Sequence, residues 1–182
     1  MKSKKRLALF TVVAIVQLFA VLYMAWQWEN TLQTGQRFLW ETAPVDPYDA
    51  FKGRYIDLGF KESSAPVADG SHLSHGEKAY AIIDENEAGM AYISSISAQP
   101  PPGKPFVKVK VYYVDRGKAH VRLPFRRYYL PEHLAAPAEI AYRESAGKTG
   151  VAAIRLKDGH GVVEELYISD KTLEEYLRTS MP

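Results

Sequence analysis

The sequence predicts a mainly β fold, in which an N-terminal transmembrane helix precedes a small antiparallel β-barrel or sandwich domain with one or two short helices. Three observations lead to this prediction. The first 30 residues contain a long apolar run without charges, and the later sequence alternates between apolar and polar residues in short segments. Clusters of Gly, Pro and Asp separate those segments, as turns separate strands.

The apolar run extends over 20 residues, from Leu7 to Trp26, with Thr11 and Gln17 as its only polar side chains. A helix rises about 1.5 Å per residue, so this run spans about 30 Å, the thickness of the hydrocarbon layer of a bilayer. Trp26 and Trp28 lie at its C-terminal end, where aromatic rings favour the headgroup zone. We therefore expect residues 7–26 to contact the lipid bilayer as a permanent anchor.

The charges around the run predict its orientation. The basic residues Lys2, Lys4, Lys5 and Arg6 precede it, and the first acidic residue is Glu29. The positive-inside rule then places the N-terminus in the cytoplasm and the rest of the chain across the membrane. A cleaved signal peptide is the competing interpretation. Its apolar region would be shorter and would end in a small-x-small cleavage site, which the exit sequence MAWQWEN does not contain.

We divide the chain into a cytoplasmic basic stub and transmembrane anchor at 1–28, a spacer at 29–36, and a β-rich domain outside the cytoplasm at 37–182. The segment 29–36 has two interpretations, a polar spacer or the frayed end of the membrane helix with Gly35 as its stop. Without the four basic residues of the stub, 19 basic residues face 21 acidic ones. Such a domain has no basic surplus for nucleic-acid phosphates, so we expect no nucleic acid as a partner. The absence of cysteine excludes disulfides and thiolate chemistry.

Alternation and turn residues predict the elements of the outer domain. In 54–60, Ile56, Leu58 and Phe60 would face inward and Tyr55 outward; in 106–115, Val107, Val109, Val111 and Tyr113 would share one face. A Ser- and Gly-rich loop is expected at 61–76, a helix at 131–146, and a last helical turn or two at 172–181 capped by Asp170 or Thr172. Strands are expected at 37–44, at 54–60, in a hairpin over 78–99, at 106–115, at 116–130 and in a hairpin over 149–170.

Two segments resemble a known bacterial family of membrane-anchored proteins, the GDYXXLXY family, whose function is uncharacterised. The first segment, APVDPYDAFKGRYIDLGF, carries a turn and then residues at the motif's spacing, namely Asp46, Pro47, Gly53, Tyr55, Leu58 and Phe60. The second, at 126–132, is similar to the family's aromatic stretch before a short helix, with Arg126, Arg127, Tyr128, Tyr129, Pro131 and Glu132. Arg54 and Phe60 depart from the motif, which has Asp and Tyr there. The resemblance implies a bacterial inner (cytoplasmic) membrane, with the domain periplasmic or extracellular.

The sequence leaves three classes of function open. The absence of a catalytic constellation favours a non-enzymatic interaction or accessory module for another membrane component, with a membrane protein as partner. The alternative is a module that binds a small anion or lipid headgroup, centred on the arginines and tyrosines of 122–129. A hydrolase is the least favoured, because no G-x-S-x-G, H-E-x-x-H or signal-peptidase serine occurs. We expect no cofactor and no metal, with the pair His72 and His75 read as part of a solvated loop.

Overall fold

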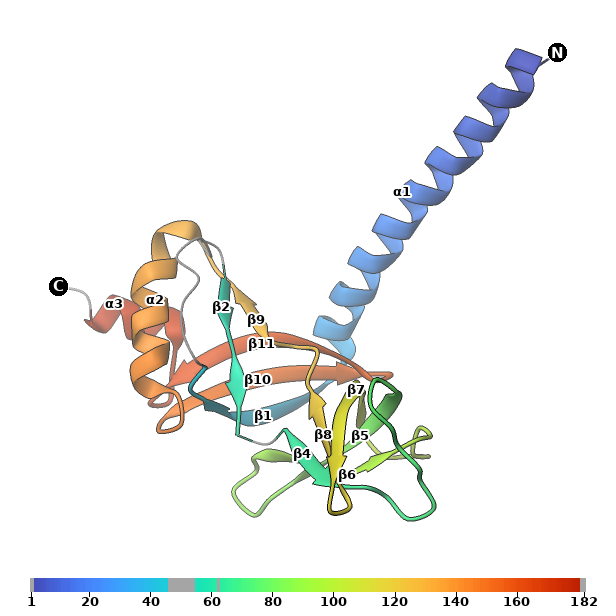
Figure 1. The fold of residues 1–182 in the computed structure, drawn as a ribbon. Coiled ribbons are helices and arrows are strands. Elements are labelled where there is room, and N and C mark those ends of the chain that lie inside the picture. Colours follow the sequence, from blue (N-terminus) through green and yellow to red (C-terminus); the bar gives the residue numbers. More distant parts are fainter. Residues whose placement is uncertain (1, 46–54, 62, 181–182) are drawn as a thin grey trace.

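The charge-free run forms the middle of one long helix, α1 (Lys2–Thr34). The computed structural model describes residues 2–45, 55–61 and 63–180, and Figure 1 shows α1 projecting from the rest of the chain as a rod. By length and composition, its segment Lys4–Thr34 can cross a membrane. Of the two interpretations of 29–36, the structure supports the helical one. The helix continues to Thr34, and the Gly35 N–H donates to the carbonyl oxygen of Thr31.

The first sheet contains five strands in the order β12-β11-β10-β1-β3, and each strand is antiparallel to its neighbours. Its centre is the predicted C-terminal hairpin, which pairs with the strand that leaves α1. The strands are β1 (Gln36–Ala43), β3 (Gly59–Phe60), β10 (Gly150–Lys157), β11 (His160–Ile168) and β12 (Lys171–Thr172).

The second sheet is barrel-like and nearly closed. Its order is β4-β8-β7-β5-β6, and its two edges meet where the Ala68 N–H donates to the carbonyl oxygen of Ile96 at 2.8 Å. The loop expected over 61–76 therefore contains a strand, β4, which sequence reasoning missed. The strands are β4 (Ser64–Pro66), β5 (Lys78–Glu85), β6 (Ala91–Ser97), β7 (Phe106–Asp115) and β8 (Lys118–Arg122).

Two predicted strands are each divided between sheets, which corrects the sequence interpretation. The segment expected at 54–60 gives β2 (Tyr55–Asp57) and then β3 in the first sheet. The segment expected at 116–130 gives β8 in the barrel-like sheet and then β9 (Arg127–Tyr129), which pairs with β2 in a separate two-stranded sheet. Both segments change sheets at the same point, where the Leu58 N–H donates to the carbonyl oxygen of Arg126 at 2.7 Å. Pro124 lacks an N–H donor, so it does not extend the ladder of β8.

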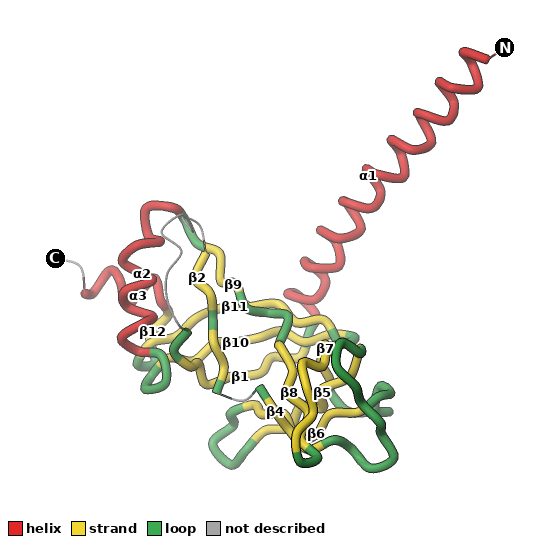
Figure 2. Tube along the Cα trace, in the orientation of Figure 1, coloured by secondary structure: helices red, strands yellow, loops and turns green. Residues whose placement is uncertain are grey.

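Two helices follow the strands at one end of the first sheet, as Figure 2 shows in red. The helix α2 (Glu132–Ser145) matches the predicted helix and buries Ala138, Ala141 and Tyr142. The helix α3 (Leu173–Ser180) begins after Thr172, whose Oγ1 accepts a hydrogen bond from the Glu175 N–H, while the Glu175 carboxylate accepts one from the Thr172 N–H. This reciprocal cap confirms Thr172 rather than Asp170 as the start signal.

The core lies inside the barrel-like sheet and between the two sheets. Val107, Val109 and Val111 are buried, as the alternation predicted, but Tyr113 is 52% exposed. The register of β7 with β8 shifts between Val111 and Tyr113. Tyr112 is the extra residue of this bulge, and Tyr112 and Tyr113 both point outward. The sheets are joined where the Lys108 N–H donates to the carbonyl oxygen of Gly159 at 2.9 Å. The expected mainly β fold is confirmed, with a barrel-like sheet beside an open one.

Candidate functional site

The structure brings the two family-like motifs together. In the pairing of β2 with β9, Tyr55 lies opposite Tyr129, Ile56 opposite Tyr128, and Asp57 opposite Arg127. Segments about 70 residues apart in sequence thus form one short ladder, which periodicity alone does not predict.

The outer face of this ladder presents aromatic rings and a cation. The Tyr55 and Tyr129 rings lie 5.7 Å apart between centroids, and the Arg127 guanidinium carbon lies 4.7 Å from the centroid of Tyr55. The Tyr129 hydroxyl, followed by Tyr55, raises the pKa of Arg127. Tyr55 is half-buried, on the face opposite the buried Ile56, as the alternation predicted. Arg127 is therefore a permanent positive charge held on a tyrosine surface.

The inner side of the same motifs has a structural role. Leu58 is fully buried, and the Phe60 ring meets the Trp40 and Phe125 rings edge-on at 5.9 and 5.5 Å between centroids. Arg126 is half-buried, and its Nε donates to the Leu58 carbonyl oxygen at 3.4 Å. These residues hold the point at which both segments of the chain change sheets.

The remaining motif residues support neighbouring elements. The Tyr128 hydroxyl donates to Glu165 at 2.7 Å, and burial together with this bond raises the pKa of Tyr128. Pro131 precedes α2, whose first residue, Glu132, places an acidic side chain at the positive end of the helix. Three predicted site residues, Asp46, Pro47 and Gly53, lie outside the described residues.

A large groove lies between the β2–β9 pair and the barrel-like sheet. It has a volume of about 1030 Å³, and its lining includes Asp57, Arg127 and Tyr129 from the paired motifs. Strands β5, β7 and β8 form the opposite wall, and Trp28 of α1 closes one side. Figure 1 shows the β2–β9 pair standing up from the sheets on the side from which α1 projects.

Positive charge dominates the lining of this groove. Asp57 is the one carboxylate among the described lining residues. Three of the cations form a row across adjacent strands, because Lys110 lies opposite both Lys78 and Arg122. Six cations line the groove, and Asp57 lies opposite one of them, Arg127, in the β2–β9 ladder. The six are Lys78, Lys108, Lys110, Arg122, Arg126 and Arg127. We call the groove that they line the basic groove.

A histidine next to the groove has a lowered pKa. His160 lies at the tip of the β10–β11 hairpin, beside the point where Gly159 accepts the Lys108 N–H. Burial, followed by the charge of Lys108, lowers the pKa of His160, although Asp158 acts in the opposite direction. Burial is the larger cause, and the contribution of Lys108 shows that positive charge from the groove reaches this hairpin.

Aromatic side chains accompany the cations. Tyr80, Tyr112 and Trp28 line the groove, and the Arg122 guanidinium carbon lies 5.2 Å from the Tyr112 centroid. Cations of this kind bind phosphate or carboxylate oxygens, and tyrosine rings pack against the carbon skeleton of a ligand. The groove is therefore suited to an anion that carries organic groups.

The sequence pointed to cations on both walls of this groove but not to the lysines of β5 and β7. It indicated the candidates Arg122, Arg126 and Arg127, and all three line the groove. It did not identify Lys78, Lys108 and Lys110. The available signal was the alternation that puts Lys108 and Lys110 on one face of β7, yet only the register adds Lys78 beside them.

Within the described part of the chain, no group of three His, Asp or Glu side chains is placed to hold a metal ion. The Nδ1 atom of His75 instead contacts the carbonyl oxygen of Tyr112. His75 thereby lies on the rim of the basic groove rather than in a cluster with His72.

Comparison with protein families gives one match, to the model described as GDYXXLXY protein, over residues 17–166. The match includes the second half of the apolar run, both motifs and every residue that lines the groove. No curated protein and no solved structure matches the chain.

Proposed function

The chain belongs to the GDYXXLXY protein family, and from this premise we propose that it is a non-enzymatic, membrane-anchored module that binds an anionic component of the cell envelope in its basic groove. The observation that carries the proposal is the row of Lys78, Lys110 and Arg122 across three neighbouring strands. Adjacent strands lie about 4.8 Å apart, and like charges placed directly opposite destabilise a sheet. A bound anion would neutralise this row and offset the cost.

The proposal includes a location. We propose that α1 crosses the bacterial inner membrane with the N-terminus in the cytoplasm and the domain periplasmic or extracellular. The length and apolar composition of Lys4–Thr34 support the crossing, and the basic residues before Leu7 support the orientation.

A membrane-protein partner, which the sequence favoured, is the second candidate here, and one observation supports it. The bulge in β7 leaves Tyr112, Tyr113 and Val114 exposed in succession at 47%, 52% and 39%. Exposed tyrosines are enriched at protein interfaces. The Tyr113 ring also stacks on His120 at 4.1 Å between centroids, so it is held in place rather than free to fold back.

The test of anion binding uses the full chain in a neutral detergent and inorganic pyrophosphate as the probe. Isothermal titration calorimetry should give saturable binding that weakens as salt rises, because five of the six groove cations are exposed to solvent. The triple variant Lys78→Gln/Lys110→Gln/Arg122→Gln should bind at least about tenfold more weakly, which corresponds to about 1.4 kcal/mol.

A matched control removes the same charge elsewhere. The variant Lys148→Gln/Lys171→Gln/Arg178→Gln changes three exposed cations at the end of the domain that carries α2 and α3. It should bind pyrophosphate like the unchanged chain. Equal weakening in both variants would mean that binding depends on net charge and not on the groove, which would refute the proposal. No binding by the unchanged chain would also refute it. A stoichiometric protein partner lost in Tyr113→Ala but kept in the groove variant would favour the second candidate.

A further inference from the structure

Trp28 places one side of the basic groove close to the end of the apolar run. Trp28 lies two positions after Trp26, the last residue of the apolar run, and it lines the groove. A helix rises about 1.5 Å per residue, so the groove wall begins about 3 Å along the helix axis beyond the end of the run. The headgroup layer is about 5–8 Å thick on each side of the hydrocarbon core. The side of the groove formed by Trp28 therefore lies at headgroup depth.

The junction between α1 and the domain keeps the groove at this height. Lys157, at the end of β10, donates from Nζ to Asn30 Oδ1 at 3.2 Å and to Thr34 Oγ1 at 2.6 Å. Arg155 donates to the Gly35 carbonyl oxygen at 3.1 Å. A Cβ atom at Gly35 would lie 2.4 Å from the Thr31 carbonyl oxygen, so the helix leads into β1 with no room for a side chain there.

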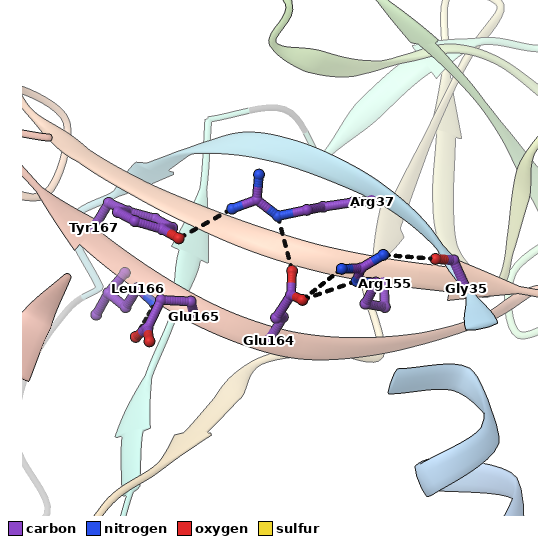
Figure 3. A network of polar contacts seen from close by, with 7 residues as sticks. All are labelled: Gly35, Arg37, Arg155, Glu164, Glu165, Leu166 and Tyr167. Carbon is purple, nitrogen blue, oxygen red and sulfur yellow. Dashed lines mark hydrogen bonds and ion pairs between the residues drawn. The ribbon is translucent and has the colours of Figure 1, made fainter. Parts of the chain in front are cut away.

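A charge network extends this clamp into the first sheet, as Figure 3 shows. Glu164 is the extra residue where the β10–β11 register shifts, and its carboxylate accepts hydrogen bonds from Arg155 and from Arg37 at 2.7 and 2.8 Å. Arg37 also donates to the Tyr167 hydroxyl at 3.0 Å. The strands β1, β10 and β11 are thus tied together next to the point where α1 leads into β1.

The chemistry of the groove matches what lies at that depth. The lipid headgroup layer offers phosphate diesters beside glycerol and the first acyl carbons. The row of Lys78, Lys110 and Arg122 is suited to the phosphate, and the rings of Trp28 and Tyr80 are suited to the less polar part. We infer that the ligand of the basic groove is the headgroup phosphate of an anionic phospholipid from the leaflet adjoining the domain. This inference rests on the proposed function and assigns the anion to one source.

The test compares phosphatidylglycerol with phosphatidylcholine. The full chain is reconstituted in nanodiscs that contain equal amounts of the two lipids, and native mass spectrometry identifies the lipid that it retains when it is released from them. Phosphatidylglycerol should be retained at least about tenfold over phosphatidylcholine by the unchanged chain and by Lys148→Gln/Lys171→Gln/Arg178→Gln. Lys78→Gln/Lys110→Gln/Arg122→Gln should lose this preference. A preference that persists in this groove variant would overturn the inference and assign the lipid to the basic residues before Leu7.

A second variant tests the height itself. Insertion of Ala-Gln-Ala-Gln between Trp26 and Gln27 adds about one helical turn and raises the groove by about 6 Å, while Trp28 keeps its place against the domain. The insertion variant should bind pyrophosphate as before but lose its preference for phosphatidylglycerol. Retained preference would overturn the inference. If the unchanged chain binds pyrophosphate but shows no lipid preference, the inference is overturned and the proposed function is left intact. If it shows neither pyrophosphate binding nor lipid preference, both the inference and the proposed function are refuted.

Discussion

Tyr142→Phe removes a single oxygen atom that holds the first motif against the first sheet. The Tyr142 hydroxyl, on α2, accepts a hydrogen bond from the Gly59 N–H at 2.9 Å and donates one to the Ala43 carbonyl oxygen at 3.0 Å. Tyr142 is 4% exposed, and burial raises its pKa. Each hydrogen bond contributes about 0.5–1.5 kcal/mol net, and a buried polar group left without a partner costs about 1–3 kcal/mol. We therefore expect the free energy of unfolding to fall by about 2–3 kcal/mol.

The measurement is urea unfolding of the full chain in neutral detergent, followed by near-ultraviolet circular dichroism. Tyr167→Phe is the matched control, because its hydroxyl accepts from Arg37 in a half-buried position, and its loss should cost about 0.5–1.5 kcal/mol. If Tyr142→Phe costs no more than Tyr167→Phe, the hydroxyl does not hold β3 against β1. The assigned role of α2 would then be wrong.

Three further predictions concern the motif surface, the junction and the orientation. Tyr55→Ala should cost about 0.5–1.5 kcal/mol in urea unfolding, since it loses a ring contact with Tyr129. The buried Phe125→Ala should cost about 3–5 kcal/mol, and equal losses would contradict the outward position of Tyr55. Burial would raise the pKa of Glu164, but hydrogen bonds from two arginines outweigh it and lower that pKa. The stability from Glu164 is then complete above its unfolded pKa of about 4.3 and is lost as the pH falls through the lowered value. Melting temperatures of Glu164→Gln should therefore change less below that pH than those of the unchanged chain, and parallel curves would contradict this. An alkaline phosphatase fused to the C-terminus should be active and a cytoplasmic fluorophore there silent, whereas the reverse pattern would refute the orientation.

Local sequence patterns were sufficient for the elements that depend on local physics. The charge-free run predicted the apolar part of α1, because its length and composition match a bilayer whatever the rest of the chain does. The alternation of the β7 valines was likewise predicted, and Thr172 was one of the two predicted caps, since alternation and capping involve residues only two or three positions apart. The family resemblance was also confirmed, because motif spacing is a property of the sequence.

The sites where the prediction failed are those where the chain leaves one sheet for another. Alternation fixes which face of a strand is apolar but does not select the neighbouring strand, so 54–60 and 116–130 were each read as one strand instead of two. The bulge before Tyr113 is also invisible locally, because it depends on the register with β8.

The sequence by itself determined that this chain carries a candidate membrane helix, a mainly β domain and two motifs of one family. Only the tertiary structure decided that the motifs pair with each other, that Lys78, Lys110 and Arg122 form one row, and that Trp28 joins them at the end of α1. The physical reason is that a groove is made by strands distant in sequence. Their charges become neighbours only when the non-local hydrogen-bond register is formed.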